Sequence, residues 1–199
     1  MATFTVIPED TFNALQVDAG VILTSFDPSS PAAPDANLVT ATTGGVKISC
    51  VPTYSDWGED VDNCPNKMKE LMHLDGWDCT LTTTAIGTSP ELIKLALGAA
   101  TESNGVVTPR ATLSQSDFSD LWWVGDKANG GFVAVKILNA LSTGGFSLTT
   151  TKNNKGQFDL EISGHVSLNA QSVVPMVFYS IDPSGSSSSG SSSSGTSNP

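Results

Sequence analysis

A two-residue alternation of apolar and polar side chains dominates this sequence and points to a largely β fold. It is clearest over residues 157–168, where the apolar positions are Phe158, Leu160, Ile162, Val166 and Leu168. Polar residues, among them Asp159, Glu161 and His165, occupy the positions between them. Successive side chains of a strand point to opposite faces of a sheet. The pattern therefore predicts a strand with one buried and one solvent-facing side.

The same period recurs elsewhere along the chain. In residues 15–23 the odd-numbered positions are apolar, and Ile22 is the exception on the polar side. Further runs rich in Thr and Val, which favour strands, predict β-structure at 46–51, 79–86, 121–124, 132–138, 146–151 and 173–179. The Asn- and Gly-containing segment 153–156 predicts a hairpin between two of these strands.

One helix is marked at both ends. Ser89 suits the N-cap, Pro90 the first turn and Gly98 the end, with an apolar stripe over residues 92–97. A second helix is predicted over residues 67–74, where apolar residues recur at helical spacing.

These elements predict an all-β fold of the β-rich α+β kind. We expect two packed antiparallel sheets, arranged as a sandwich or a partly closed barrel, with one flanking helix and one long loop. Residues 1–181 are predicted to form one domain. Residues 182–199 are nearly all Ser and Gly, and a segment so poor in apolar residues is predicted to be a disordered tail.

The connection over residues 54–78 is far longer than the usual hairpin loop of about 2–5 residues. It combines seven acidic residues and two lysines with six large apolar residues: Trp57, Met68, Leu71, Met72, Leu74 and Trp77. Two interpretations remain open. The segment folds back on its own domain, or it is an arm whose apolar residues contact another subunit.

The chemistry of most enzymes and metal sites is missing from the sequence. Only two histidines are present, and no Gly-x-Ser-x-Gly motif marks a nucleophile, so we expect no catalytic residue. The spacing of the three cysteines does not fit a zinc site, and we expect reduced thiols at Cys50, Cys64 and Cys79. The acidic run at 56–62 lacks the ligand pattern of a calcium loop. We therefore predict no metal, no cofactor and no enzymatic activity.

Charge and aromatic residues exclude further classes. The chain has 20 acidic and 9 basic residues, a net charge of -11, which disfavours a basic nucleic-acid-binding face. We expect no signal peptide and no membrane span. Trp122 and Trp123 are adjacent, so in a strand they cannot form one flat platform for a sugar. We expect one of them in the core and Trp123 at a subunit contact.

Four segments resemble the major tail proteins of long, non-contractile-tailed phages of Gram-positive bacteria. They are TTGGVKISCVPTYSDWGEDV at 42–61 and the shorter segments 14–21, 119–131 and 138–151. The resemblance extends from residue 14 to residue 179 and consists of extended similarity without a chemical motif.

The resemblance implies a structural virion protein that forms homohexameric rings, which stack into a tail tube for genome delivery. Its partners would be other copies of itself and the tail tape measure, tail terminator and distal tail proteins. It would be assembled in the bacterial host cytoplasm. DNA would pass an acidic lumen without specific binding, and we expect Asp159 and Glu161 to face that lumen. Alternatives are an inner-tube protein of a contractile tail or related secretion system, or a monomeric β-sandwich carbohydrate-binding module.

Overall fold

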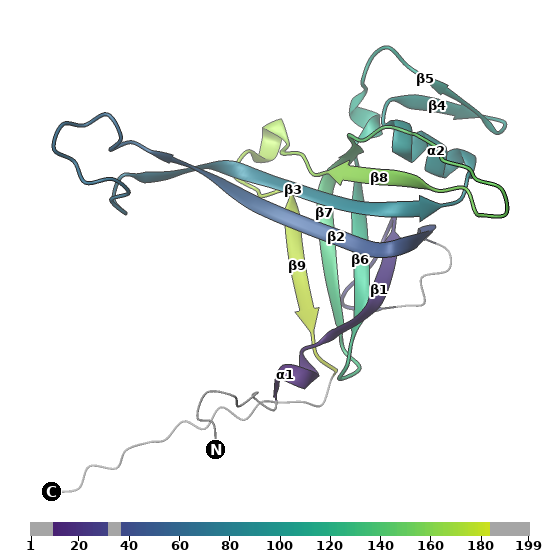
Figure 1. Cartoon of the computed structure of the whole chain (residues 1–199), viewed down its shortest axis with the longest axis horizontal. Helices are drawn as coiled ribbons and strands as arrows, with labels where there is room; N and C mark the ends of the chain where they lie inside the picture. The colour runs from purple at the N-terminus through teal and green to yellow at the C-terminus, as the bar shows by residue number, and fades with distance from the viewer. Residues whose placement is uncertain (1–9, 32–36, 184–199) are drawn as a thin grey trace, which may run out of the picture.

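The computed structural model describes residues 10–31 and 37–183, and its strands form two layers that cross at a large angle (Figure 1). The first layer contains β1 (Gln16–Leu23), β6 (Ser119–Lys127), β7 (Phe132–Ser142) and β9 (Met176–Ile181). The second layer contains β2 (Leu38–Asp56), β3 (Met72–Ile86) and β8 (Phe158–Ser163). Adjacent strands are antiparallel. The predicted fold class, mostly β with two packed layers, is confirmed.

The two layers belong to one continuous sheet with the strand order β6-β1-β2-β3-β8-β7-β9. β6 also pairs with β7, so the strands from β6 round to β7 close into a ring. β9 lies outside this ring and pairs with β7. A separate hairpin of β4 (Ala100–Ser103) and β5 (Val106–Pro109) lies next to the helix (Figure 1).

The main core fills the space between the layers. Its buried residues include Ile22, Leu81, Val135, Leu160 and Ile162. A second, smaller cluster of Leu23, Trp122 and Ala134, packed against by Phe26, lies on the opposite face of the first layer. The first layer is therefore covered by apolar side chains on both faces.

Trp122 and Trp123 point into these two different clusters, as their adjacency predicts. The prediction that Trp123 lies at a subunit contact is wrong. Its side chain is only 7% exposed, and its ring Nε1 donates a hydrogen bond of 3.0 Å to the carbonyl oxygen of Ala19. Because both faces of the layer are covered, neither tryptophan side chain is exposed for contact with another subunit.

The predicted helix is confirmed as α2 (Pro90–Leu97). The hydroxyl of Ser89 accepts a hydrogen bond from the Leu92 amide at 3.3 Å, and Gly98 ends the helix with a positive φ of 68°. α1 (Asp10–Asn13), η1 (Gln115–Asp117) and η2 (Leu168–Ala170) are single turns. In the described parts of the chain, no helix has the length and hydropathy needed to cross a membrane.

The alternating pattern predicts β8 correctly only in part. Phe158, Leu160 and Ile162 are buried, and the residues between them are exposed. The strand ends at Ser163, and the amide of Gly164 donates to the Cys79 carbonyl oxygen at 2.9 Å. The predicted continuation to residue 168 is wrong, since Leu168 is 83% exposed.

In β1 the predicted buried face is correct only at its end, where Leu23 is buried and Val21 packs beside it, whereas Val17 and Ala19 are exposed. Asp18 and Gly20 have positive φ angles, and the pairing with β6 shifts register between Val17 and Val21. The shift interrupts the period of two, so Val17 is exposed and Ile22 enters the core.

Three other local predictions fail or shift. Residues 146–151 form only an isolated bridge from Thr149 to Gln157, and residues 67–74 are turns followed by the start of β3, without a helix. The last strand begins at Met176 and not at residue 173. Most of the predicted disordered tail, residues 184–199, lies outside the described residues, as do residues 1–9 and 32–36 of the predicted domain.

Candidate functional site: the arm, the open edges and a basic loop

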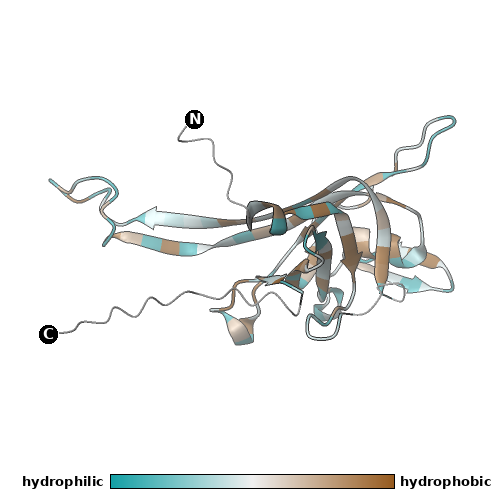
Figure 2. Cartoon of the chain, turned by 90° about the horizontal axis from the view of Figure 1, so that it is seen from below, coloured by the Kyte–Doolittle hydropathy of each residue, from teal (hydrophilic) through white to brown (hydrophobic). Residues whose placement is uncertain are grey.

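The segment predicted as a long loop is a β-hairpin. β2 and β3 stay paired as far as Asp56 and Met72, and only residues 57–71 form the connection between them. The hairpin extends well beyond the core at one end of the long axis (Figure 1), and hydrophobic and hydrophilic residues are interspersed along it (Figure 2). We call residues 51–78 the arm and residues 57–71 its tip.

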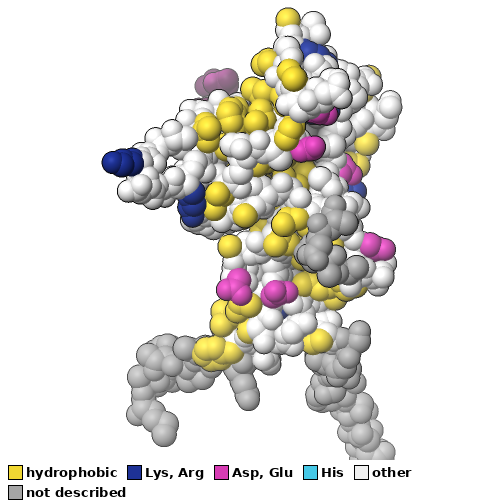
Figure 3. Space-filling model, turned by 90° about the vertical axis from the view of Figure 1, so that its right-hand side faces the viewer, with side chains coloured by type: hydrophobic (Ala, Val, Ile, Leu, Met, Phe, Trp, Pro, Cys, Tyr) yellow, Lys and Arg dark blue, Asp and Glu magenta, His cyan; other side chains and the backbone are white. Residues whose placement is uncertain are grey.

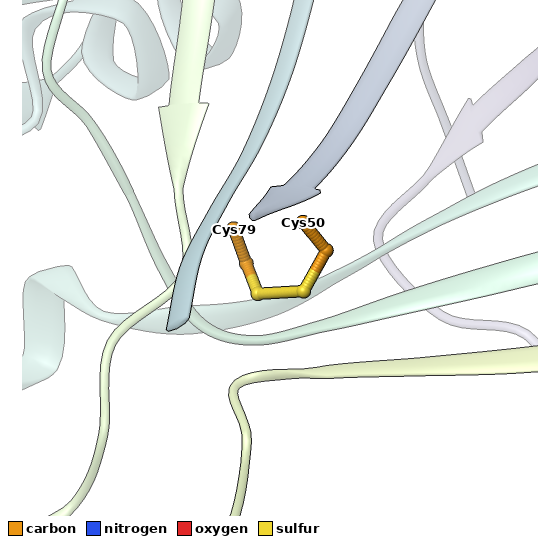
Figure 4. The surroundings of a disulfide bond; sticks show 2 residues. All are labelled: Cys50 and Cys79. Carbon is orange, nitrogen blue, oxygen red and sulfur yellow. A yellow bond between two sulfur atoms is a disulfide. The ribbon is translucent and has the colours of Figure 1, made fainter. Parts of the chain in front are cut away.

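A disulfide between Cys50 and Cys79 marks the root of the arm (Figure 4). The two residues are direct partners in the β2–β3 register. The expectation of three reduced thiols is therefore wrong for this pair, while Cys64 in the tip is free. The disulfide joins the two strands where they leave the core, since Cys79 is buried there with Leu81.

The tip has a defined fold of its own. The Asp56 carboxylate accepts hydrogen bonds from the amides of Gly58 and Lys67, each at 2.9 Å, and so joins both ends of the tip. The Trp57 amide donates to the Leu71 carbonyl oxygen at 3.0 Å. Gly58 is buried in close contact with Leu71, since a Cβ there would come within 2.9 Å of the Leu71 side chain, which would have to move.

The six apolar residues predicted as contact residues all lie on the arm. Trp57 is 65% exposed and stacks on His73, with 4.6 Å between the ring centroids. Leu71 is half-buried, and the other four are about two-fifths exposed: Met68, Met72, Leu74 and Trp77. Exposed aromatic and Met side chains on a projecting element are typical of a protein interface.

The outer face of the second layer is polar. Its cross-strand rows place Thr84 between Thr43 and Asp159, and Thr82 between Lys47 and Glu161. Both predicted acidic residues are exposed on this face, and Thr84 donates to the Asp159 carboxylate at 3.0 Å. These rows line a shallow hollow of about 510 Å³. Their orientation towards a channel stays a prediction.

Two strands present unpaired edges. Within the described ranges β9 pairs only with β7, and Phe178 on it is 59% exposed. β2 pairs with β1 only near Thr40, so from Val46 onward one side of it has no strand partner in those ranges. Such edges expose backbone donors and acceptors that another chain can pair with.

The loop 143–157 between β7 and β8 is basic. It carries Lys152 and Lys155 and no acidic residue. Hydrogen bonds between the backbones of Thr149 and Gln157 hold its two sides together, at 3.0 and 3.2 Å, and residues 147–155 are exposed. We did not expect a functional role for this loop, although its lack of acidic residues is visible in the sequence.

A hollow of about 560 Å³ lies beside α2 and near β6 and β7. Asp117 on its wall is held by Arg110 and by the Ser114 amide, which lower the pKa of the carboxyl below its usual range. Neither histidine lines it: His73 is on the arm, and His165 contacts the Asn139 carbonyl oxygen. Among the described residues no cluster of three or more His, Cys, Asp or Glu could hold a metal ion.

No protein-family model matches the sequence, and no curated protein matches it. Among solved structures, a chain of the virion of native gene transfer agent (GTA) particle superposes with a TM-score of 0.42 and 9% sequence identity. The superposition covers 81% of this chain and 95% of that chain. At this score and identity, the likeness identifies neither the family nor the function of the chain.

Proposed function

We propose that this chain is a structural virion protein without enzymatic activity: a subunit of rings that stack into a phage tail tube. The observation that carries the proposal is the arm. It is a two-stranded ribbon that leaves the core and exposes five of the six predicted apolar side chains, of which Trp57 is the most exposed. An isolated hairpin is marginally stable in water, so a partner surface would stabilise this one.

The open strand edges support closure into a ring. An exposed edge such as that of β9 favours aggregation unless another strand covers it. Two different open edges, that of β9 in one copy and that of β2 in the next, would cover each other head to tail around a closed ring. Six copies per ring is the number that the resemblance to phage tail proteins implies.

The polar outer face of the second layer suits the wall of a DNA conduit. Asp159 and Glu161 on β8 are exposed there and would repel phosphates, while their partners Thr84 and Thr82 on β3 are uncharged. A basic wall would bind DNA by releasing counterions at each contact, whereas an acidic wall lets it pass.

In the virion the tube would also contact proteins other than itself. We propose the tail terminator at one end, the distal tail protein at the other and the tape measure inside, with assembly in the host cytoplasm and no membrane insertion by this chain. An inner tube of a contractile tail or related secretion system would use the same ring and the same arm. A sheath protein that binds the assembled tube would favour that alternative.

Negative-stain electron microscopy of the purified chain tests the proposal. We expect rings or hollow tubes that become more abundant with concentration. Monomers at every concentration and salt level would refute the tube and favour the monomeric carbohydrate-binding module.

A shortened arm tests its role. Residues 57–71 are replaced by an Asn-Gly turn, which can join the register partners Asp56 and Met72. We expect single rings that do not stack. The matched control replaces two exposed apolar residues outside the arm, Val106 and Leu113, by Ser and should form normal tubes. Normal tubes from the shortened chain would contradict the role of the arm.

A further inference from the structure

We propose that the arm of each copy docks on the basic loop 143–157 of the next copy along the stack. This inference rests on the proposed function and adds to it the receiving surface and the direction of assembly. The occupant of the exposed apolar surface of the arm is thus a second copy of this chain.

The arm combines apolar contact residues with negative charge. It holds seven of the 20 acidic residues of the chain and only two lysines. Asp56 and Asp75 are engaged in hydrogen bonds within the arm. Within the described structure the carboxylates of Glu59, Asp60 and Asp62 at the tip form no salt bridge and remain exposed beside Trp57.

The basic loop has the complementary character. No acidic residue occurs between Asp126 and Asp159 in a chain that is otherwise rich in them. Lys152 and Lys155 are exposed at the outer part of the loop and form no salt bridge to any described residue. Leu148, which is 42% exposed, offers an apolar contact beside them.

The other basic residues outside the arm are less suited to receive it. Arg110, Lys127 and Lys136 are paired with Asp117, Asp182 and Asp120 respectively. Lys47 shares its cross-strand row with Glu161, and Lys94 lies on α2, which also carries Glu91. The basic loop therefore bears the one pair of lysines in the described structure that lies on a single exposed loop with no acidic residue in its own sequence.

The positions of the two surfaces determine what the contact would build. The arm tip and the basic loop lie at opposite ends of the longest axis of the molecule (Figure 1), so one copy cannot join them within itself. In the view onto the end opposite the arm, basic side chains protrude at one flank (Figure 3). A contact between two different surfaces of identical chains generates a ring where the rotation between copies closes and an open, polar array where it does not. Surfaces at opposite ends of the molecule suit the open array. Opposite charges would also steer the encounter, over about 8 Å at physiological salt.

Charge reversal tests the pairing. The loop variant Lys152→Glu/Lys155→Glu should raise the concentration needed for tube formation by about tenfold at low salt. The arm variant Glu59→Lys/Asp60→Lys should do the same, and the chain carrying all four changes should restore assembly. A control of equal charge change, Lys94→Glu/Ser103→Asp/Val106→Asp on α2, β4 and β5, leaves both the arm and the basic loop intact and should assemble like the wild type.

Carbodiimide cross-linking of wild-type tubes provides a second readout. Mass spectrometry should identify intermolecular peptides that join Lys152 or Lys155 to Glu59, Asp60 or Asp62. Two results would overturn this inference while leaving the proposed function intact. The loop variant forms tubes at the same concentration as the wild type, or the chain with all four changes fails to assemble. A wild-type chain that forms no ring or tube would refute both.

Discussion

Individual side chains show where a two-residue period reports burial and where it does not. Leu160 and Ile162 follow the period because one face of β8 contacts the core and the other is exposed. Trp122 and Trp123 are both buried although they are neighbours, because the first layer has apolar clusters on both faces. A strand that is covered on both faces shows no alternation of apolar and polar residues, so the pattern cannot identify its buried side. The position of Trp123 could not have been predicted from its own segment.

Replacement of Ile162 by Ala should lower the free energy of unfolding by about 2–5 kcal/mol, because its side chain is fully buried between the layers. Its exposed neighbour on the same strand gives the control. Glu161→Ala should change stability by no more than about 0.5 kcal/mol. Chemical denaturation followed by tryptophan fluorescence measures both. Equal effects of the two changes would contradict the assigned faces of β8.

Asp117 makes part of the stability depend on pH. The Ser114 amide and the Arg110 guanidinium lower the pKa of its carboxyl below the ordinary value of 3.8. A lowered folded-state pKa means that the contribution is present above the ordinary value and is lost as pH falls through the lowered one. The stability difference between the wild type and Asp117→Asn should therefore be constant near neutral pH and shrink below about pH 4. A difference that does not change with pH would refute this coupling.

Among the secondary structure elements, the helix was fully predictable and the arm was not. Ser89, Pro90 and Gly98 are local signals that act within one helix, and they mark its true ends. The arm has no buried face, so its strands show no period of two, and the acidic residues and Pro52 disfavour a strand assignment. The large apolar residues of the arm were still identified, because their side chains stand out in an acidic segment without knowledge of the fold.

The disulfide at the root of the arm could not be predicted either, because it depends on the pairing of β2 with β3. Cys50 and Cys79 lie on opposite strands of the hairpin as direct register partners, so they could be matched only once the hairpin was known. In protein purified without reductant, a thiol reagent under denaturing conditions should modify one cysteine, Cys64, and all three after reduction. In the Cys64→Ser variant the reagent should modify no cysteine before reduction. Three reactive thiols without reductant would show that the bond is absent.

Loss of that disulfide should also destabilise the chain. It closes a loop with a sequence separation of 29 residues, for which loop-closure entropy corresponds to about 3–4 kcal/mol. Thermal unfolding with and without reductant measures this difference. The Cys64→Ser variant, which keeps the disulfide, should lose the same stability on reduction as the wild type.

At the scale of the whole molecule, the sequence supports two packed antiparallel layers and a flanking helix, which the structure confirms. The closure of β6 onto β7 and the open edge of β9 could not be predicted, because strand order depends on contacts between segments distant in sequence. The opposite positions of the arm and the basic loop follow from that order as well.

The polar outer face carries a prediction about the assembled tube. Tubes of Asp159→Lys/Glu161→Lys should retain DNA, and the retention should fall steeply as salt rises, because each new lysine can neutralise a phosphate. Glu91→Lys/Glu102→Lys changes charge equally on α2 and β4 and serves as the control. Equal DNA retention by both variants, measured by filter binding, would place the outer face of β8 away from the channel.

The continuity of β2 and β3 from the core to the arm has a mechanical consequence. A tensile load applied at the tip and directed along the strands passes through both covalent backbones into the core, where the hydrogen bonds between β3 and β8 resist it together. The bridge between Cys50 and Cys79 keeps the two strands side by side where they leave the core. Such a ribbon resists stretching yet bends easily out of its plane. Joints made from it would keep neighbouring subunits attached while a long filament curves.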